Sequence, residues 1–111
     1  MNIQTLLTFL LVLLCVQARA DEGKIAINSP GDGSVLSAKS RIALGYDATL
    51  SADSDHLLLY VDGSRIDVLR QIKGRVELNP LPPGEHRICI SLNTKSYLPT
   101  GIDACVDIIS R

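Results

Sequence analysis

Apolar and polar residues alternate along most of the chain after its first twenty positions. Residues 85–92 place Ile88 and other aliphatic side chains on one side of an extended chain, and residues 103–108 do the same. Successive side chains of a strand point to opposite faces, so both segments are predicted to be strands with one buried face. Cys89 and Cys105 both fall on the polar faces. That shared parity is what a bridge between two neighbouring strands requires.

Shorter alternating or apolar runs, separated by Gly, Pro, Asn, Asp and Ser clusters, predict the other strands. No window shows sustained helical periodicity. About seven short strands favour an all-β fold, an antiparallel immunoglobulin-like sandwich, with an up-and-down barrel as the alternative. The remaining predicted strands cover residues 24–28, 41–47, 56–61, 65–70 and 75–78, with a brief edge pairing at 35–36.

The first twenty residues predict a secretory signal peptide. Residues 3–16 are almost wholly apolar, and residues 18–20 place alanines at the two positions that a signal peptidase recognises. An uncleaved membrane anchor is the alternative, but the apolar run is short for a spanning helix. Residues 21–111 are then a single domain without a membrane span, and the expected location is periplasmic or secreted.

Cleavage would remove Cys15 and leave Cys89 and Cys105 as an even pair. An even pair in an exported chain predicts a disulfide. A redox or metal-binding thiol pair is the alternative, although this spacing fits no redox motif. The domain would carry a net charge of about −2, which argues against nucleic acid and against an anionic membrane surface as partners.

Catalytic chemistry has little support in the sequence. There is no Gly-x-Ser-x-Gly, phosphate loop or dinucleotide fingerprint, and the serines lie mostly in turns. A Ser-His-Asp site built on His56 or His86 is conceivable from composition alone. We therefore predict a protein that is not an enzyme and uses no cofactor.

Metal binding is the main chemical alternative. His56 and His86 each open a predicted strand, and neighbouring strands would let the imidazoles approach each other and bind copper or zinc. A four-ligand site would have to add Asp53, Asp55 or Tyr97. The competing interpretation is two surface histidines at strand ends. The acidic loop at 53–55 lacks the further ligands of a calcium loop.

Two surfaces are candidates for binding a partner. Leu58 and Tyr60 share a face opposite to that of the other apolar residues of their strand, so exposure would create a small apolar patch. The loop at 93–102 carries Lys95 and Tyr97 and would be fixed at its base by the disulfide, which lowers the entropy lost on binding. The predicted function is an exported interaction module for an unknown envelope or extracellular protein.

Two short motifs resemble those of small exported bacterial domains of largely unknown function. His56 with Val61-Asp62-Gly63, followed by Pro83-Gly84-Glu85-His86, is similar to their His-x-His-x-x-Val-Asp-Gly and Pro-Gly-x-His patterns. The resemblance implies an immunoglobulin-like sandwich and, in some members, a metal site. The same pattern ends with a His-x-Pro near the last turn. Here Leu58 stands in place of the second histidine of the first motif, and Tyr97, in Tyr97-Leu98-Pro99, stands in place of the last, so most of such a site would be missing.

Overall fold

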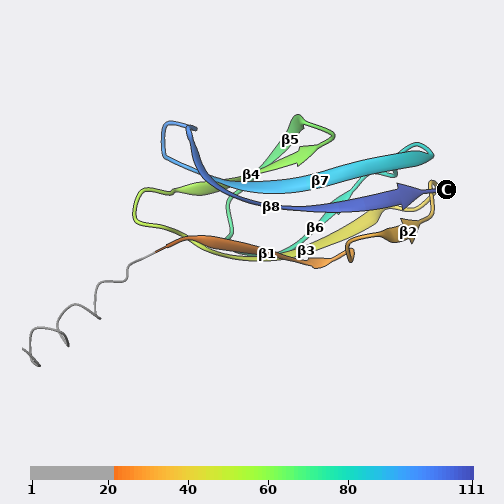
Figure 1. Ribbon diagram of the computed structural model, residues 1–111, viewed down its shortest axis with the longest axis horizontal. Helices are drawn as coiled ribbons and strands as arrows, with labels where there is room; N and C mark the ends of the chain where they lie inside the picture. Colours follow the sequence, from red (N-terminus) through yellow and green to blue (C-terminus); the bar gives the residue numbers. More distant parts are fainter. Residues whose placement is uncertain (1–21) are drawn as a thin grey trace, which may run out of the picture.

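The computed structural model describes residues 22–111, so the predicted signal peptide at 1–20 lies outside the described part of the chain. Two β-sheets pack face to face (Figure 1). The smaller sheet has the order β1-β3-β6, and the larger has the order β2-β8-β7-β4-β5. The strands are β1 (Lys24–Ser29), β2 (Ser34–Leu36), β3 (Ile42–Thr49), β4 (His56–Val61), β5 (Ser64–Leu69), β6 (Lys73–Leu78), β7 (Gly84–Asn93) and β8 (Pro99–Ser110).

The predicted all-β sandwich is confirmed, and the barrel alternative is wrong because the two sheets do not close on each other. The pairing is antiparallel except where β2 runs parallel to β8. Counting β2 as a strand gives eight strands rather than about seven. Among residues 22–111, no helix is long and apolar enough to cross a membrane.

Alternation along the strands builds the core between the sheets. Leu44 of β3 lies opposite the larger sheet's inner face, where Leu59 and Ile90 are fully buried. These side chains stay out of water because every second position of each strand points inward. The core is aliphatic apart from Tyr46, whose hydroxyl donates a hydrogen bond to the Gln71 carbonyl oxygen at the rim.

The turn between β4 and β5 follows directly from its sequence. Asp62 and Gly63 form a two-residue loop, and both have positive φ angles, 51° and 84°. This is the backbone of a type I′ turn, in which Asp-Gly is strongly favoured because its twist matches that of the flanking strands. The tight turn places β5 at one edge of the larger sheet and fixes the position of the Asp62 carboxylate.

The predicted disulfide is present and joins β7 to β8. Cys89 and Cys105 are direct register partners, with their Cα atoms 4.1 Å apart. Cys89 is half-buried and Cys105 is exposed, so the bridge lies on the outer face of the larger sheet. The parity argument from the sequence is therefore confirmed.

Replacing both Cys89 and Cys105 with serine is expected to lower the free energy of unfolding by about 3 kcal/mol, because the bridge closes a loop of fifteen residues. Urea unfolding of the variant and of the oxidised wild type measures the loss. Wild type unfolded with a reductant should match the variant. Equal unfolding midpoints for the oxidised wild type and the variant would contradict the prediction.

Candidate functional site

The β7–β8 loop has a tip that is fixed by its own hydrogen bonds. The Thr94 amide donates to the Leu98 carbonyl oxygen and the Tyr97 amide donates to the Thr94 carbonyl oxygen, both at 2.9 Å. The Leu98 amide donates to the Thr94 hydroxyl at 3.2 Å. Tyr97 adopts a left-handed backbone with φ of 67°, which is uncommon for a bulky residue. The turn presents Tyr97, 43% exposed, and Leu98, 62% exposed.

Tyr97 lies across the outer face of the larger sheet. Its ring stacks on His56 of β4, with centroids 4.3 Å apart and planes tilted by 52°. The Arg65 guanidinium of β5 lies 5.7 Å from the centroid of the same ring, within cation–π range. The three side chains form a stack that links the loop to two strands, and we call it the His56–Tyr97–Arg65 stack.

The predicted apolar patch of Leu58 and Tyr60 lies on the same face of β4 as His56. Leu58 lies between His56 and Tyr60 on one face of β4, yet it is only 2% exposed. Tyr60 is half-buried. Leu58 is therefore not available to a partner, and its assignment as a contact residue is wrong. Tyr97 of the β7–β8 loop packs on His56, two positions before Leu58 on the same face of β4, so this face is not open to solvent along its whole length. Lys95 and Tyr97 are exposed as predicted.

His56 is buried rather than a surface residue. Its Nδ1 lies 3.1 Å from the Asp55 carboxylate. A carboxylate accepts hydrogen bonds, so Nδ1 carries the proton and Nε2 is left with a lone pair in the neutral ring. Among the described residues Nε2 has no hydrogen-bond partner. The backbone supports the same corner, since the Asp55 amide donates to the Asn93 carbonyl oxygen at 2.8 Å.

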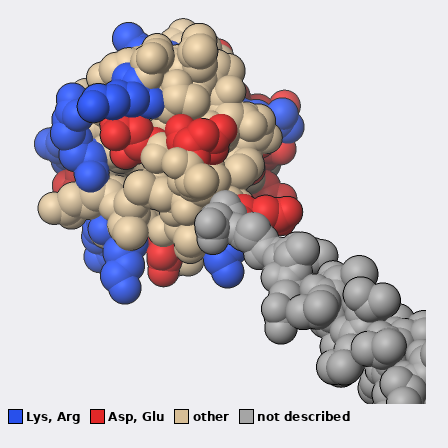
Figure 2. Space-filling view, turned by 90° about the vertical axis from the view of Figure 1, so that its left-hand side faces the viewer, with Lys and Arg blue, Asp and Glu red and all other residues tan. Residues whose placement is uncertain are grey.

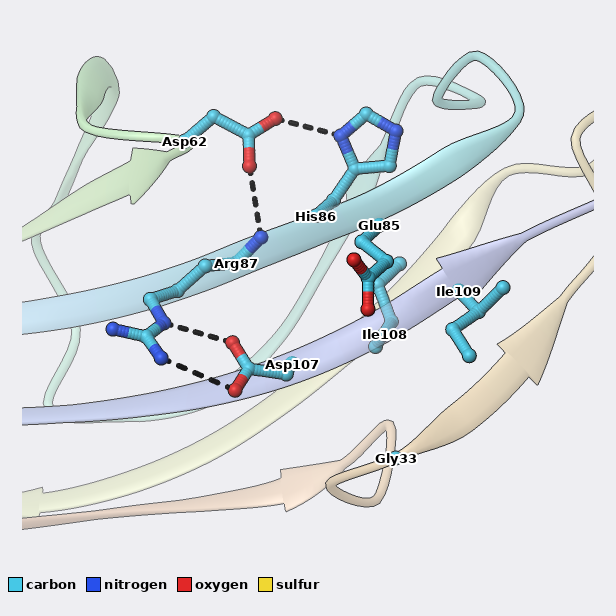
Figure 3. A pocket seen from close by; sticks show the side chains of 8 residues that line it. All are labelled: Gly33, Asp62, Glu85, His86, Arg87, Asp107, Ile108 and Ile109. Carbon is cyan, nitrogen blue, oxygen red and sulfur yellow. Dashed lines mark hydrogen bonds and ion pairs between the residues drawn. The ribbon is translucent and has the colours of Figure 1, made fainter.

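A second polar cluster lies at the opposite end of β7 (Figure 3). His86 Nδ1 is 2.6 Å from Asp62 Oδ2, and Nε2 is 2.7 Å from the Pro82 carbonyl oxygen. The other Asp62 oxygen accepts the Arg87 amide at 2.8 Å. Both ring nitrogens face acceptors, so both must donate, and the ring in this arrangement is an imidazolium.

These hydrogen bonds shift the pKa values of both His86 and Asp62. The Asp62 hydrogen bond, followed by that to Pro82, raises the pKa of His86 above its ordinary 6.5. The His86 hydrogen bond, followed by the Arg87 amide, lowers the pKa of Asp62 below 3.8. The His86 side chain is 11% exposed and that of Asp62 48%. The cluster is therefore a charged pair at the rim of the sandwich.

An ion pair continues this cluster across the sheet. Arg87 donates two hydrogen bonds to Asp107 of β8, from Nε at 2.8 Å and from Nη2 at 3.2 Å. These bonds lower the pKa of Asp107. Asp32, from the turn before β2, accepts the Asp107 amide at 2.8 Å. The cluster thus connects the β1–β2 turn, β7, β8 and the β4–β5 turn, and its donors are engaged within the fold.

The structure does not bring His56 and His86 together. β4 and β7 are neighbours, as predicted, but they are antiparallel and each histidine lies at or near the start of its own strand. His56 is opposite Asn93, and His86 lies seven positions farther along β7. At about 3.3 Å per residue this places them roughly 23 Å apart, far beyond one ion's coordination sphere. A copper or zinc site shared by both histidines is wrong.

Other combinations do not replace that site. Among residues 22–111, no three His, Cys, Asp or Glu side chains gather closely enough to hold a metal ion. In the same residues no serine hydroxyl lies within hydrogen-bond distance of either histidine ring. The geometry offers neither histidine as the base of a Ser-His-Asp site.

The residue that sequence reasoning missed is Asp62. In the sequence, Asp62-Gly63 predicts only a tight hairpin turn, whereas in the structure the Asp62 carboxylate also accepts hydrogen bonds from His86 and Arg87. Its signal is present in the two motifs, because Val-Asp-Gly supplies the acceptor and Pro-Gly-x-His supplies the donor. Leu98 was also missed as an exposed apolar residue, since the predicted loop placed no limit on which of its side chains face water.

No protein-family model matches the chain, and no curated protein matches it. Solved structures do share its fold. The fibronectin(III)-like modules of CbhA from Clostridium thermocellum match with a TM-score of 0.65 and 17% identity, over 78% of this chain and 96% of that chain. The CARDB domain of the PF1109 protein from Pyrococcus furiosus, in complex with di-metal ions, matches with a TM-score of 0.58 and 11% identity, over 82% and 89%.

A third match is the extracellular domain of the putative one component system BT4673 from B. thetaiotaomicron, with a TM-score of 0.53 and 12% identity, over 83% of this chain and 16% of that chain. At such identities the likeness shows the fold alone. The chain is an immunoglobulin-like, fibronectin III-like module. The immunoglobulin-like fold that the resemblance implies is confirmed, and the resemblance to small exported bacterial domains itself stays a prediction.

The His86–Asp62 pair is expected to make stability depend on pH. His86 has a raised folded-state pKa, so its contribution is complete below about 6.5 and is lost as pH rises through the raised value. Asp62 has a lowered pKa, so its contribution is lost as pH falls below 3.8. The difference in unfolding free energy between wild type and His86→Gln should therefore be largest between these limits.

Urea unfolding of wild type and His86→Gln measures this difference. It is carried out at several pH values between 3.8 and 6.5 and at pH values above the raised pKa of His86, whose titration is followed by NMR. Asp62→Asn is the matched variant and should reduce the same pH dependence. A stability difference between wild type and His86→Gln that is independent of pH would exclude the proposed linkage.

Proposed function

We propose that this chain is an exported, non-enzymatic module that binds another protein through the tip of its β7–β8 loop. The contact surface consists of Lys95, Tyr97 and Leu98 with Arg65 beside them, and we call it the tip surface. Export is supported by the disulfide, since such bonds persist in oxidising compartments. A periplasmic or secreted location follows from this proposal.

The observation that carries the proposal is the exposure of two large apolar side chains on a turn that is already rigid. Most of the surface of Leu98 faces water, so burial in the core does not explain an apolar residue at this position. Three hydrogen bonds to Thr94 hold the backbone of the turn. A fixed loop loses little entropy when a partner binds, so more of the contact energy appears as affinity.

The composition of the tip surface suits protein recognition. Tyrosine and arginine are enriched among the residues that dominate binding energy, and Tyr97 and Arg65 are already oriented against each other. Figure 2 faces the end of the molecule where the β7–β8 loop lies. It shows acidic side chains near the centre and basic ones gathered at the left, around uncharged surface. The presence of both signs of charge on this face, rather than a basic patch, favours a protein partner over nucleic acid.

The non-enzymatic part of the proposal rests on the state of the two histidines. His86 has both ring nitrogens engaged, and His56 is buried beneath Tyr97 with Asp55 at Nδ1. The alternative of a copper or zinc protein has no comparable support, because the two imidazoles lie at opposite ends of β7. His86 thus has no free ring nitrogen, and the Nε2 of His56, unpaired among residues 22–111, is buried away from solvent.

Leu98→Ser is expected to weaken capture of the partner by at least about tenfold, because it removes an exposed apolar anchor without disturbing the stack. Quantitative pull-down from an envelope or extracellular extract measures this. Val35→Ser is the matched control, since Val35 is also exposed but lies on β2. Tyr97→Ala should weaken capture too, and it also uncovers His56, so its unfolding midpoint is measured alongside.

Identical sets of captured proteins for wild type, Leu98→Ser and Tyr97→Ala would count against the tip surface. Equal losses for Leu98→Ser and Val35→Ser would indicate non-specific adhesion through exposed apolar residues instead.

A further inference from the structure

The sandwich has four edge strands, and three of them are blunted. An unpaired edge invites pairing with another chain, so proteins interrupt or shorten such strands. β2 is only three residues long. The register of β1 shifts between Ile27 and Ser29, and the register of β4 with β5 shifts between Leu59 and Tyr60. These short or irregular strands make poor templates for strand addition.

Besides the register shift with β4, β5 carries a charged residue that opposes pairing with another strand. Asp67 is the register partner of Leu59, whose side chain is in the core, so the carboxylate lies on the inward face of an edge strand. Its Oδ1 also accepts the Val68 amide at 2.8 Å. Inward charges of this kind oppose pairing with another strand.

β6 lacks these interruptions. It is six residues long, pairs only with β3, and keeps a regular register from Lys73 to Leu78. It is exposed at Lys73, Arg75 and Glu77. Charged side chains normally discourage strand addition, so the order of these charges decides which strand the edge can accept.

Apolar surface lies beside this edge. A groove of about 480 Å³ opens between β5 and β6, where the two sheets are not joined. Ile66 on the β5 side is 49% exposed. The apolar residues lining the groove are Val61, Ile66, Val76, Leu78 and Leu81.

The charges of β6 are complementary to themselves. Arg75 and Glu77 flank Val76 symmetrically, so antiparallel pairing of two β6 strands centred on Val76 places each Arg75 opposite the other copy's Glu77. Opposite charges in directly opposed positions stabilise a strand pair, and like charges destabilise it. On β3 the residues opposite Arg75 and Glu77 are the small Gly45 and Ala43, so no large β3 side chain crowds Arg75 or Glu77 when they pair with a second copy. The Glu77 contact with Arg41 is solvent-exposed and 3.4 Å long.

We propose that β6 is a self-association edge, at which a second copy of this chain pairs antiparallel about Val76. The result is a two-fold dimer in which the two smaller sheets become one continuous sheet. The pairing satisfies the unpaired backbone groups of β6, matches two Arg75–Glu77 pairs, and brings together the open grooves on which Ile66 is exposed. This surface is separate from the tip surface.

Charge reversal tests the pairing. Sedimentation velocity of the oxidised protein over a wide concentration range should show a reversible dimer. Glu77→Arg and Arg75→Glu each create two like-charge oppositions and should weaken the dimer by at least about tenfold. The double variant Arg75→Glu/Glu77→Arg restores both pairs and should recover dimerisation. Asp103→Arg, which makes the same change of net charge as Glu77→Arg but on β8, should leave dimerisation unchanged.

Hydrogen exchange gives a second readout, because backbone amides along residues 73–78 should exchange more slowly at high concentration in wild type and in the double variant. A wild type that stays monomeric at the highest concentration would overturn the proposal. So would single variants that dimerise like wild type, or a double variant that does not recover. Leu98→Ser should dimerise normally, so failure here and failure of the tip surface are distinguishable.

Discussion

The antiparallel register of β4, β7 and β8 is the constraint on which the other features depend. It makes Cys89 and Cys105 direct partners and so allows the disulfide. It also continues past Val61, so that the Asp62 amide donates to the Arg87 carbonyl oxygen at 2.8 Å while the Asp62 carboxylate accepts the Arg87 amide. The same register sends the starts of β4 and β7 to opposite ends of the sheet, which separates the two histidines.

Strand positions and the disulfide could be predicted because both depend on parity, a local property. When only one face of a strand is apolar, that face is predicted to be buried. In β7 this face carries Ile88, Ile90 and Leu92, which are all buried in the structure. β4 was harder, since apolar residues occupy both of its faces. The outer face of β4 is covered in part by Tyr97, which packs on His56, is distant in sequence and has an unusual left-handed backbone. No periodicity carries that information.

The separation of the histidines could have been anticipated from topology but not from residue types. Two neighbouring strands bring their first residues together only if they are parallel, and β4 and β7 are antiparallel. The Asp62–His86 bond shows the converse case. Its two residues lie 24 positions apart, and each was assigned only a local meaning, one as a turn residue and the other as the start of a strand. The Val-Asp-Gly and Pro-Gly-x-His motifs therefore each contain one partner of the bond, but the sequence does not show that the two residues bind each other.

The two ends of the larger sheet use their polar groups differently. At the β4–β5 turn, the His86, Arg87, Asp62 and Asp107 side chains satisfy one another, so the end is held together and offers few free donors. At the other end, one side of Tyr97 packs on His56 while a large part of its ring stays exposed next to Leu98. Tyr97 therefore both packs on His56 and contributes to the exposed surface, whereas most of Leu98 is exposed. Replacing Leu98 is therefore expected to change the exposed surface at little cost to the fold, whereas replacing Tyr97 also removes its packing on His56.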